Sequence, residues 1–190
     1  MKLIHCADIH LDSPMQTHMT AQQASVRNTE MLQSFVRLTE FAQERAVRAV
    51  LIAGDLFDGA RVRARTVDAL LAAIRRTPEV DYLYLPGNHD EAANAFCDCA
   101  LPGNLKLFGK TWSTVQYDGI AISGVQIGAD AALYETLPHT DGAVNLVMLH
   151  GGIGTACGED MINLNLLKNR GIDYLALGHL HTYQTGRLSD

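Results

Sequence analysis

The segment AVLIAGDLFD, residues 49–58, decides how the chain is interpreted. Its first half, Ala49–Ala53, is a short uninterrupted apolar run that stops at a glycine, which is typical of a strand buried in a parallel sheet. Gly54 lets the backbone bend sharply where the strand ends, and Asp55 follows at once with a carboxylate. The segment therefore predicts a core strand that delivers an acidic side chain to the carboxyl end of a sheet.

Similar apolar runs recur along the chain and predict further strands. Besides Ala49–Ala53, four short runs predict strands: Lys2–Ala7, Tyr82–Leu85, Val144–Leu149 and Tyr174–Leu177. Two more flank the dipeptide Asp118-Gly119, which is typical of a tight hairpin turn, and they span Thr114–Tyr117 and Ile120–Ser123.

Helical patterns lie between these strands. The predicted helices span Gln22–Arg45, Arg65–Arg76 and Asp160–Asn169. The second is the clearest, because its apolar residues recur at the spacing of one helix face, at Val67, Leu70, Leu71 and Ile74. Strands that alternate with helices predict an α/β fold in one continuous domain.

Composition excludes several classes of protein. The chain has 190 residues, about one domain, and 47% of them are hydrophobic, enough to fill a core. No apolar run is long enough to span a membrane, and four cysteines without a C-x-x-C pair favour a reducing cytoplasmic location. A net charge of −6 argues against a protein that grips DNA by bulk positive charge, but it allows contact with phosphate through bound metal.

Polar side chains follow five of the predicted strands at the point where each strand ends. These side chains are acids, an amide and imidazoles: Asp8, His10, Asp55, Asn88, His150, His179 and His181. The carboxyl ends of strands in α/β sheets form the crevice where ligands bind. The pattern therefore predicts a single site that collects all of these residues.

The chemistry of these donors points to metal ions. Carboxylate, amide and imidazole ligands together suit Mn²⁺, Fe²⁺ or Zn²⁺. The set is too large for one ion and fits two ions that share a carboxylate, an arrangement that stabilises both oxygens of an in-line phosphoryl displacement. His89 directly follows Asn88, so we expect it to reach the substrate as an acid or hydrogen-bond donor, oriented by Asp90.

In this order the motifs resemble the calcineurin-like metallophosphoesterases. They are Asp8-x-His10, Gly54-Asp55, Gly87-Asn88-His89-Asp90, His150 and Gly178-His179-x-His181. The segments HCADIHLDSP, residues 5–14, and GDLFD, residues 54–58, further resemble bacterial SbcD-type DNA repair exonucleases.

The resemblance implies a fold of two mixed β-sheets packed face to face and flanked by helices, a four-layer sandwich. It implies one metal ion held by Asp8, His10, Asp55 and His181. It implies a second ion held by Asp55, Asn88, His150 and His179. His89 would stand beside the scissile phosphate and assist the leaving group while a metal-activated hydroxide attacks.

The implied activity is Mn²⁺-dependent cleavage of DNA, 3′→5′ from ends and as an endonuclease, in DNA repair. The implied partner is an SbcC-type coiled-coil ATPase, and helices after the Asp55 and Asp90 motifs would pair across a homodimer. The family normally continues well beyond the position of His181 with further strands and a capping region. We therefore expect residues 1–190 to be a nuclease domain truncated at its C-terminus.

Two other functions fit the same motifs. The first is a phosphatase or phosphodiesterase of the same superfamily that acts on a nucleotide or another small phosphoester. The second is a metal-dependent assembly subunit without catalysis, which the presence of His89 argues against. Asp58 departs from the pattern of archaeal and eukaryotic relatives, which often have a histidine at this position, although SbcD-like proteins accept an aspartate.

Residues outside the motifs carry weaker signals. Arg61, Arg63 and Arg65 follow the Asp55 loop and could contact phosphates, or could form the solvated start of a helix. We expect the remaining histidines, at positions 5, 18 and 139, not to bind metal. A thiol pair at positions 97 and 99 is poor support for a metal site.

Overall fold

The computed structural model describes residues 1–15, 19–59, 62–90, 96, 99–126, 132–155 and 160–188. The interpretations that concern His18, Arg61, Cys97 and Cys157 lie outside the described residues. In the part that is described, no helix combines the length and apolar character that crossing a membrane requires.

The first sheet contains the strand that opened the sequence analysis. It has the order β1-β2-β3-β4, and every neighbouring pair is parallel. Its strands are β1 (Leu3–Cys6), β2 (Ala49–Ala53), β3 (Asp81–Leu85) and β4 (Leu105–Leu107). We expected both sheets to be mixed. The described strands of this sheet are instead all parallel.

The second sheet is mixed, as expected, and has the order β10-β7-β6-β5. Its strands are β5 (Ser113–Tyr117), β6 (Ile120–Gly124), β7 (Val144–His150) and β10 (Tyr174–Gly178). The hairpin predicted around Asp118-Gly119 is confirmed by the antiparallel pairing of β5 with β6, while the other pairs are parallel.

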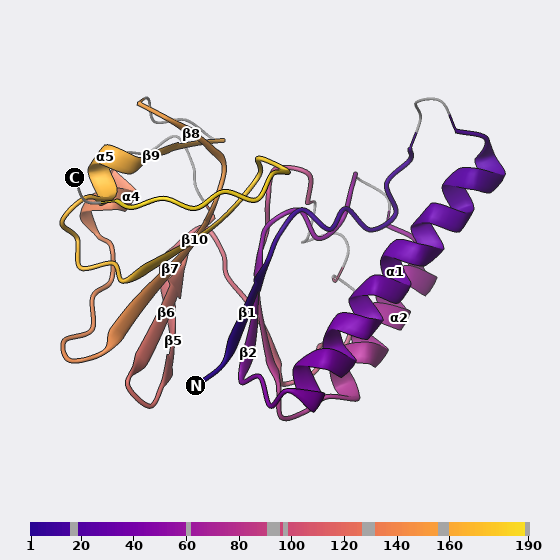
Figure 1. Cartoon of the computed structure of the whole chain (residues 1–190), viewed down its shortest axis with the longest axis horizontal. Helices are drawn as coiled ribbons and strands as arrows, with labels where there is room; N and C mark the ends of the chain where they lie inside the picture. The colour runs from indigo at the N-terminus through magenta and orange to yellow at the C-terminus, as the bar shows by residue number, and fades with distance from the viewer. Residues whose placement is uncertain are drawn as a thin grey trace.

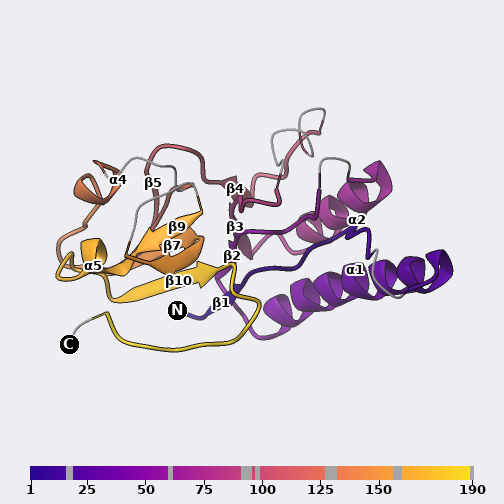
Figure 2. The ribbon, with the colours of Figure 1, turned by 90° about the horizontal axis from the view of Figure 1, so that it is seen from above.

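Alternating side chains of β2 face two different cores. Val50 and Ile52 pack with helices α1 (Ala21–Glu44) and α2 (Ala64–Arg75) on the outer face of the first sheet. Leu51 belongs to a second core between the two sheets, with residues such as Met148 of β7. Because both faces of β2 are covered, a continuous apolar run is what this strand requires. Figure 2 shows the helices on one side of the first sheet and the second sheet on the other.

The outer face of the second sheet is covered differently. A third core there includes Tyr134 and Leu167, from the single-turn helices α4 (Ala132–Glu135) and α5 (Leu164–Leu167). Figure 1 shows these two short helices at the end of the molecule opposite α1 and α2.

The two long helices agree with their predicted ranges to within one residue. The apolar face predicted for α2 is core, since Val67, Leu70, Leu71 and Ile74 are all at most 3% exposed. This face packs against the chain's own first sheet, as expected for core residues.

The helix predicted over Asp160–Asn169 is wrong. Residues Met161–Asn163 form β9 instead and pair in parallel with β8 (Gly152–Gly154). Only the four residues of α5 are helical, and the side chain of Asn163 caps them by accepting a hydrogen bond from the N–H of Asn165 at 3.1 Å. The pairing with β8 outweighs the local helical pattern, as tertiary contacts often do.

The carboxyl ends of β2, β7 and β10 meet because small residues let the two sheets approach closely. A side-chain Cβ at Gly178 would lie 2.1 Å from the carbonyl oxygen of Ala53. A Cβ at Gly54, whose φ is +91°, would lie 1.9 Å from Nδ1 of His150. The glycines that end these strands therefore allow loops of both sheets to share one site.

Candidate metal centre

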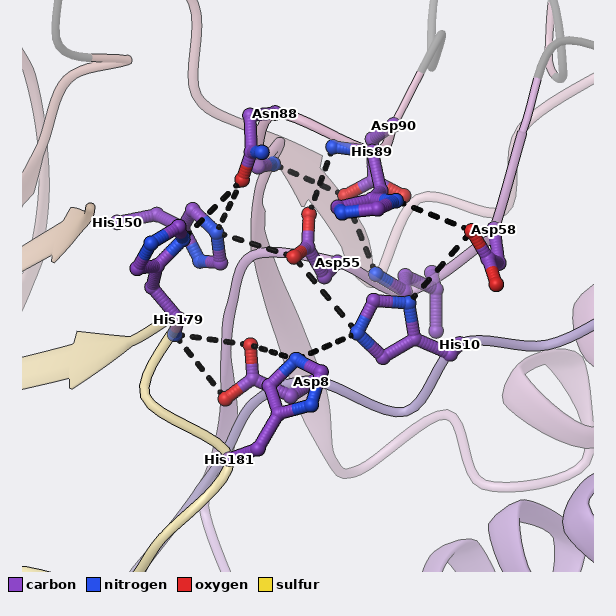
Figure 3. Close-up of polar contacts among 12 residues, drawn as sticks. Asp8, His10, Asp55, Asp58, Asn88, His89, Asp90, His150, His179 and His181 are labelled. Atoms are coloured by element: carbon purple, nitrogen blue, oxygen red, sulfur yellow. Dashed lines mark hydrogen bonds and ion pairs between the residues drawn. The ribbon is translucent and has the colours of Figure 1, made fainter. Parts of the chain in front are cut away.

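Five segments of the chain bring the predicted site residues together at one end of the two sheets. Figure 3 shows the side chains converging, with His150 at the last position of β7 and the others in the loops that follow β1, β2, β3 and β10. Several of these residues have a left-handed backbone that residues other than glycine rarely adopt. They are Asp8 (φ 55°), His10 (49°), Asp55 (51°), His179 (104°) and His181 (49°). Such strain concentrates at functional sites, where surrounding contacts hold it in place.

The first group of donors consists of Asp8, His10, Asp55 and His181, whose ligand atoms lie within 4.8 Å of one another. The two imidazoles face each other, with 2.9 Å between Nε2 of His10 and Nε2 of His181. Nε2 of His10 also lies 3.7 Å from Oδ2 of Asp55, and Nε2 of His181 lies 3.9 Å from Oδ1 of Asp8. Nitrogen and oxygen lone pairs that converge in this way suit a divalent cation.

The second group consists of Asp55, His150 and His179. The side-chain oxygen of Asn88 completes it, at 3.1 Å from Nε2 of His150 and 3.3 Å from Nδ1 of His179. Nδ1 of His150 lies 2.9 Å from the carbonyl oxygen of Ala53 and donates to it. That hydrogen bond fixes the tautomer and leaves Nε2 free to act as a ligand, as in many metal sites.

Asp55 belongs to both groups. It is fully buried, and its Oδ1 accepts the backbone N–H of His89 at 3.0 Å. Its Oδ2 has no hydrogen bond within the described chain, although it lies 3.2 Å from Nε2 of His150. A buried carboxylate oxygen without a donor is costly unless a cation meets it. The donor set and this orphaned oxygen therefore fit two divalent ions that share Asp55.

Asp55 and His150 shift each other's pKa in opposite directions. Burial by itself would raise the pKa of Asp55, but the nearby imidazole of His150 and the backbone N–H of His89 bring it below its usual range. Burial by itself would lower the pKa of His150, but Asp55 raises it overall. The carboxylate is therefore ionised in the folded protein, as a bridging ligand must be.

Asp8 also ties two loops together. Its carboxylate accepts the backbone N–H of His179, at 2.8 Å to Oδ1 and 3.1 Å to Oδ2. The loop after β1 is thus fastened to the loop after β10, which belongs to the other sheet.

The side chain of His89 stands at the open side of the centre, 48% exposed. Its Nδ1 lies 3.0 Å from Oδ1 of Asp58, and its ring packs edge-on against that of His10 with 5.1 Å between centroids. Figure 3 shows Asp58 beside the His89 ring. Asp58 therefore orients this histidine. In the sequence, Asp58 stands out as the last residue of GDLFD and as a position where some relatives have a histidine. Neither pattern predicts its contact with His89.

Asp90 has a different role from the one predicted. Its carboxylate accepts three backbone N–H groups, from Leu56 (3.1 Å), Phe57 (2.7 Å) and Gly87 (2.9 Å). It does so because the turn that starts at Gly87 folds the Asp90 side chain inward, where it is buried. Burial raises its pKa above the usual range, against the effect of these donors. Asp90 braces two ligand-bearing loops and does not contact the His89 ring.

Other candidate residues lie outside both groups. His5 contacts the hydroxyl of Tyr174 (3.0 Å) and the carbonyl of Leu177 (3.1 Å), and His139 lies 3.4 Å from Asp141. Cys6 belongs to neither group, and burial raises the pKa of its thiol to about 12.

Comparisons with known proteins identify the family of this chain. The sequence profile of the calcineurin-like phosphoesterase family matches residues 1–183. The uncharacterised metallophosphoesterase YhaO of Bacillus subtilis is 27% identical over 202 residues, which covers 97% of this chain and 49% of that protein. The DNA double-strand break repair protein Mre11 of Methanopyrus kandleri is 25% identical over 209 residues, 95% of this chain and 44% of that protein.

Among solved structures, the nuclease MPE of Pseudomonas putida is 18% identical with a TM-score of 0.33, and the match covers 76% of this chain and 58% of that one. The chain spans about half the length of the curated relatives it matches. The match to the family profile extends over nearly all of the sequence, including every motif that supplies the centre. The chain belongs to the calcineurin-like phosphoesterase family.

Proposed function

We propose that the chain is a DNA phosphodiesterase that works with two divalent metal ions. The observation that carries this proposal is the position of Asp55, whose buried Oδ2 lies between His10 of one donor group and His150 of the other. A shared carboxylate is what two neighbouring ions need, since it offsets part of their mutual repulsion.

The ligands follow from the two groups. One ion is held by Asp8, His10, Asp55 and His181, and the other by Asp55, Asn88, His150 and His179. Oxygen and nitrogen donors without a thiolate accept Mn²⁺, Fe²⁺ or Zn²⁺, and the resemblance to SbcD-type nucleases favours Mn²⁺ among them. When bound, the ions supply a nucleophile at neutral pH and neutralise charge on the phosphoryl oxygens.

The chain's own contribution to the reaction comes mainly from His89. Asp58 holds Nδ1 of His89 at 3.0 Å, so Nε2 is the ring atom that can donate to a departing oxygen. The contact with Asp58 also limits rotation of the ring, which keeps Nε2 in a fixed direction. The exposed position of His89 leaves room for a long substrate beside it.

DNA is the substrate class that the relatives support best. Mre11 of Methanopyrus kandleri is described as a DNA double-strand break repair protein, and the similarity covers nearly the whole of this chain. With the SbcD-like segments at residues 5–14 and 54–58, this supports 3′→5′ exonuclease and endonuclease activity in DNA repair. We place the chain as the nuclease domain of a four-layer metallophosphoesterase sandwich. We further propose that the chain works with an SbcC-type coiled-coil ATPase and pairs with a second copy of itself. We also propose a cytoplasmic location.

The test is hydrolysis of an end-labelled DNA duplex with Mn²⁺, run beside a small chromogenic phosphodiester and repeated with His89→Ala. We expect mononucleotides from the labelled duplex and their loss in the variant. Cleavage of the small diester alone would contradict the DNA assignment and favour a phosphodiesterase for small phosphoesters. Cleavage of neither compound by a chain that has bound Mn²⁺ would contradict catalysis itself.

A further inference from the structure

Asp12 is a buried carboxylate just beyond the proposed metal ligands, and the proposed reaction does not use it. Its side chain is only 5% exposed. Oδ2 accepts the backbone N–H of Arg63 at 2.8 Å, and Oδ1 accepts Nε of Arg63 at 2.9 Å and the hydroxyl of Thr66 at 3.0 Å. Nη2 of Arg63 makes a further hydrogen bond to Oδ1. Such a set of donors fixes the carboxylate in one position.

These contacts fasten the loop after β1 to the start of α2. Arg63 is the N-cap residue of α2, and its own side chain does not cap the helix. The first turn of a helix has N–H groups without partners in the helix, and an acidic side chain is a preferred acceptor there. Asp12 supplies this acceptor from 51 residues earlier in the chain.

The loop that Asp12 anchors carries two of the proposed ligands. It lies alongside residues 54–58, where the N–H groups of Asp8, His10 and Leu11 donate to the carbonyls of Gly54, Asp55 and Leu56. The N–H of Ser13 closes a turn on the carbonyl of His10 at 3.2 Å. Asp12 lies inside this turn, so its position and that of His10 are coupled.

The backbone of the loop is strained in an alternating pattern. Asp8, His10 and Asp12 have φ angles of 55°, 49° and 64°, in the left-handed region that these residues rarely adopt. A conformation of this kind persists only where contacts hold it. After His10, the contacts of Asp12 with Arg63 and Thr66 hold the loop against the start of α2.

We infer that Asp12 is a positioning residue that, through the turn it shares with His10, holds the His10 imidazole in place for one of the two metal ions. The inference rests on the proposed two-metal function and adds a residue that controls one site and not the other. Partners that orient a ligand typically change metal affinity by about 10–100-fold when they are removed.

The experiment counts Mn²⁺ ions and measures their affinities by isothermal titration, without any substrate. Asp12→Asn keeps the shape of the side chain but places an N–H₂ group against the donors of Arg63. Asp141→Asn is the matched control, since it makes the same change at a fully exposed carboxylate. Asn88→Ala provides a background in which the proposed site around His10 is the one that remains.

In the Asn88→Ala background we expect one Mn²⁺ per chain, and we expect Asp12→Asn to weaken its binding about 10–100-fold. Asp141→Asn should change it less than twofold. If Asp12→Asn does not fold, Thr66→Val and Arg63→Lys remove single contacts to Asp12, and a several-fold loss of affinity is expected from each.

Affinities within twofold of the parent protein in every folded variant of this set would overturn the inference while leaving the two-metal proposal intact. A wild-type chain that binds fewer than two Mn²⁺ ions would instead overturn the proposed function, and this inference with it.

Discussion

The imidazole of His89 takes its orientation from Asp58, a residue 31 positions away in the sequence, and not from its neighbour Asp90. Sequence adjacency suggested the wrong partner, because a turn sends consecutive side chains to opposite sides. The backbone N–H of His89 points to Asp55, which holds the turn so that the ring faces outward. Asn88 and His89 are adjacent in the sequence but have separate proposed roles, the first in metal binding and the second in proton donation.

This separation predicts the behaviour of His89→Ala. Turnover on DNA should fall by about 10²–10⁴-fold, because the departing oxygen loses its proton donor. Mn²⁺ binding should be unchanged within twofold. The loss should be smaller on a nitrophenyl phosphodiester, whose leaving group needs little protonation, and steady-state kinetics on both substrates checks this. Equal losses on both substrates would contradict the role of His89 as donor.

Asp58→Asn is the companion variant. It replaces the carboxylate that lies 3.0 Å from Nδ1 of His89 with an amide while leaving His89 itself in place. We expect a loss of about 10–100-fold in kcat, which is smaller than the loss in His89→Ala. If His89→Ala is already present, adding Asp58→Asn should cost little more, because the two residues act as one unit.

Cys6 provides a test of the donor set. Its thiol pKa is raised to about 12 by burial, so at pH 8 it is almost wholly protonated in the folded chain. Its alkylation by iodoacetamide should be at least about 100-fold slower in the native state than in urea, and peptide mass spectrometry can follow this residue alone. The rate should rise as the pH rises toward 12. Fast native labelling at pH 8 would show an accessible thiolate beside the proposed ligands.

At the scale of elements, most of the ligands are carried by loops, and the carboxylates of Asp8 and Asp90 tie those loops together. Asp8 joins the loops after β1 and β10, and Asp90 joins the loops after β2 and β3. Strand ends bring the loops close, and these hydrogen bonds hold them in fixed positions.

Asp90→Asn should therefore weaken the whole centre. An amide N–H₂ would face donors that now bind a carboxylate, which we expect to cost about 2 kcal/mol in the free energy of unfolding. For a domain of this size the melting temperature should fall by roughly 5 °C. Asp118→Asn, in the exposed hairpin turn, is the control and should leave it unchanged. An Asp90→Asn protein as stable and as active as wild type would show that the brace is dispensable.

The strands that carry the site could be predicted because each is a short, mostly apolar run with a polar ligand residue at or just after its end. The strands β4, β8 and β9 could not, since each has only three residues, too few to show a strand pattern in the sequence. The contacts of Asp12, Asp58 and Asp90 were equally hidden. They join residues 31 to 51 positions apart, or turn inward through a local bend, and sequence spacing shows neither.

At the scale of the whole molecule, the centre exists because two sheets meet at their carboxyl ends. The first sheet supplies Asp8, His10, Asp55 and Asn88, and the second supplies His150, His179 and His181. Neither sheet alone holds a complete set for either ion. The function therefore depends on the core between the sheets, including Leu51 and Met148, as much as on the ligands.

The central claim is that two ions share Asp55, and the number of Mn²⁺ ions bound per chain tests it most directly. Equilibrium dialysis of the wild-type chain should give two Mn²⁺ per chain, and Asp55→Asn should give at most one, bound weakly. Circular dichroism should show both proteins folded, so that the loss reflects the missing carboxylate. Equal stoichiometry and affinity in the two proteins would contradict the shared ligand and the two-metal account built on it.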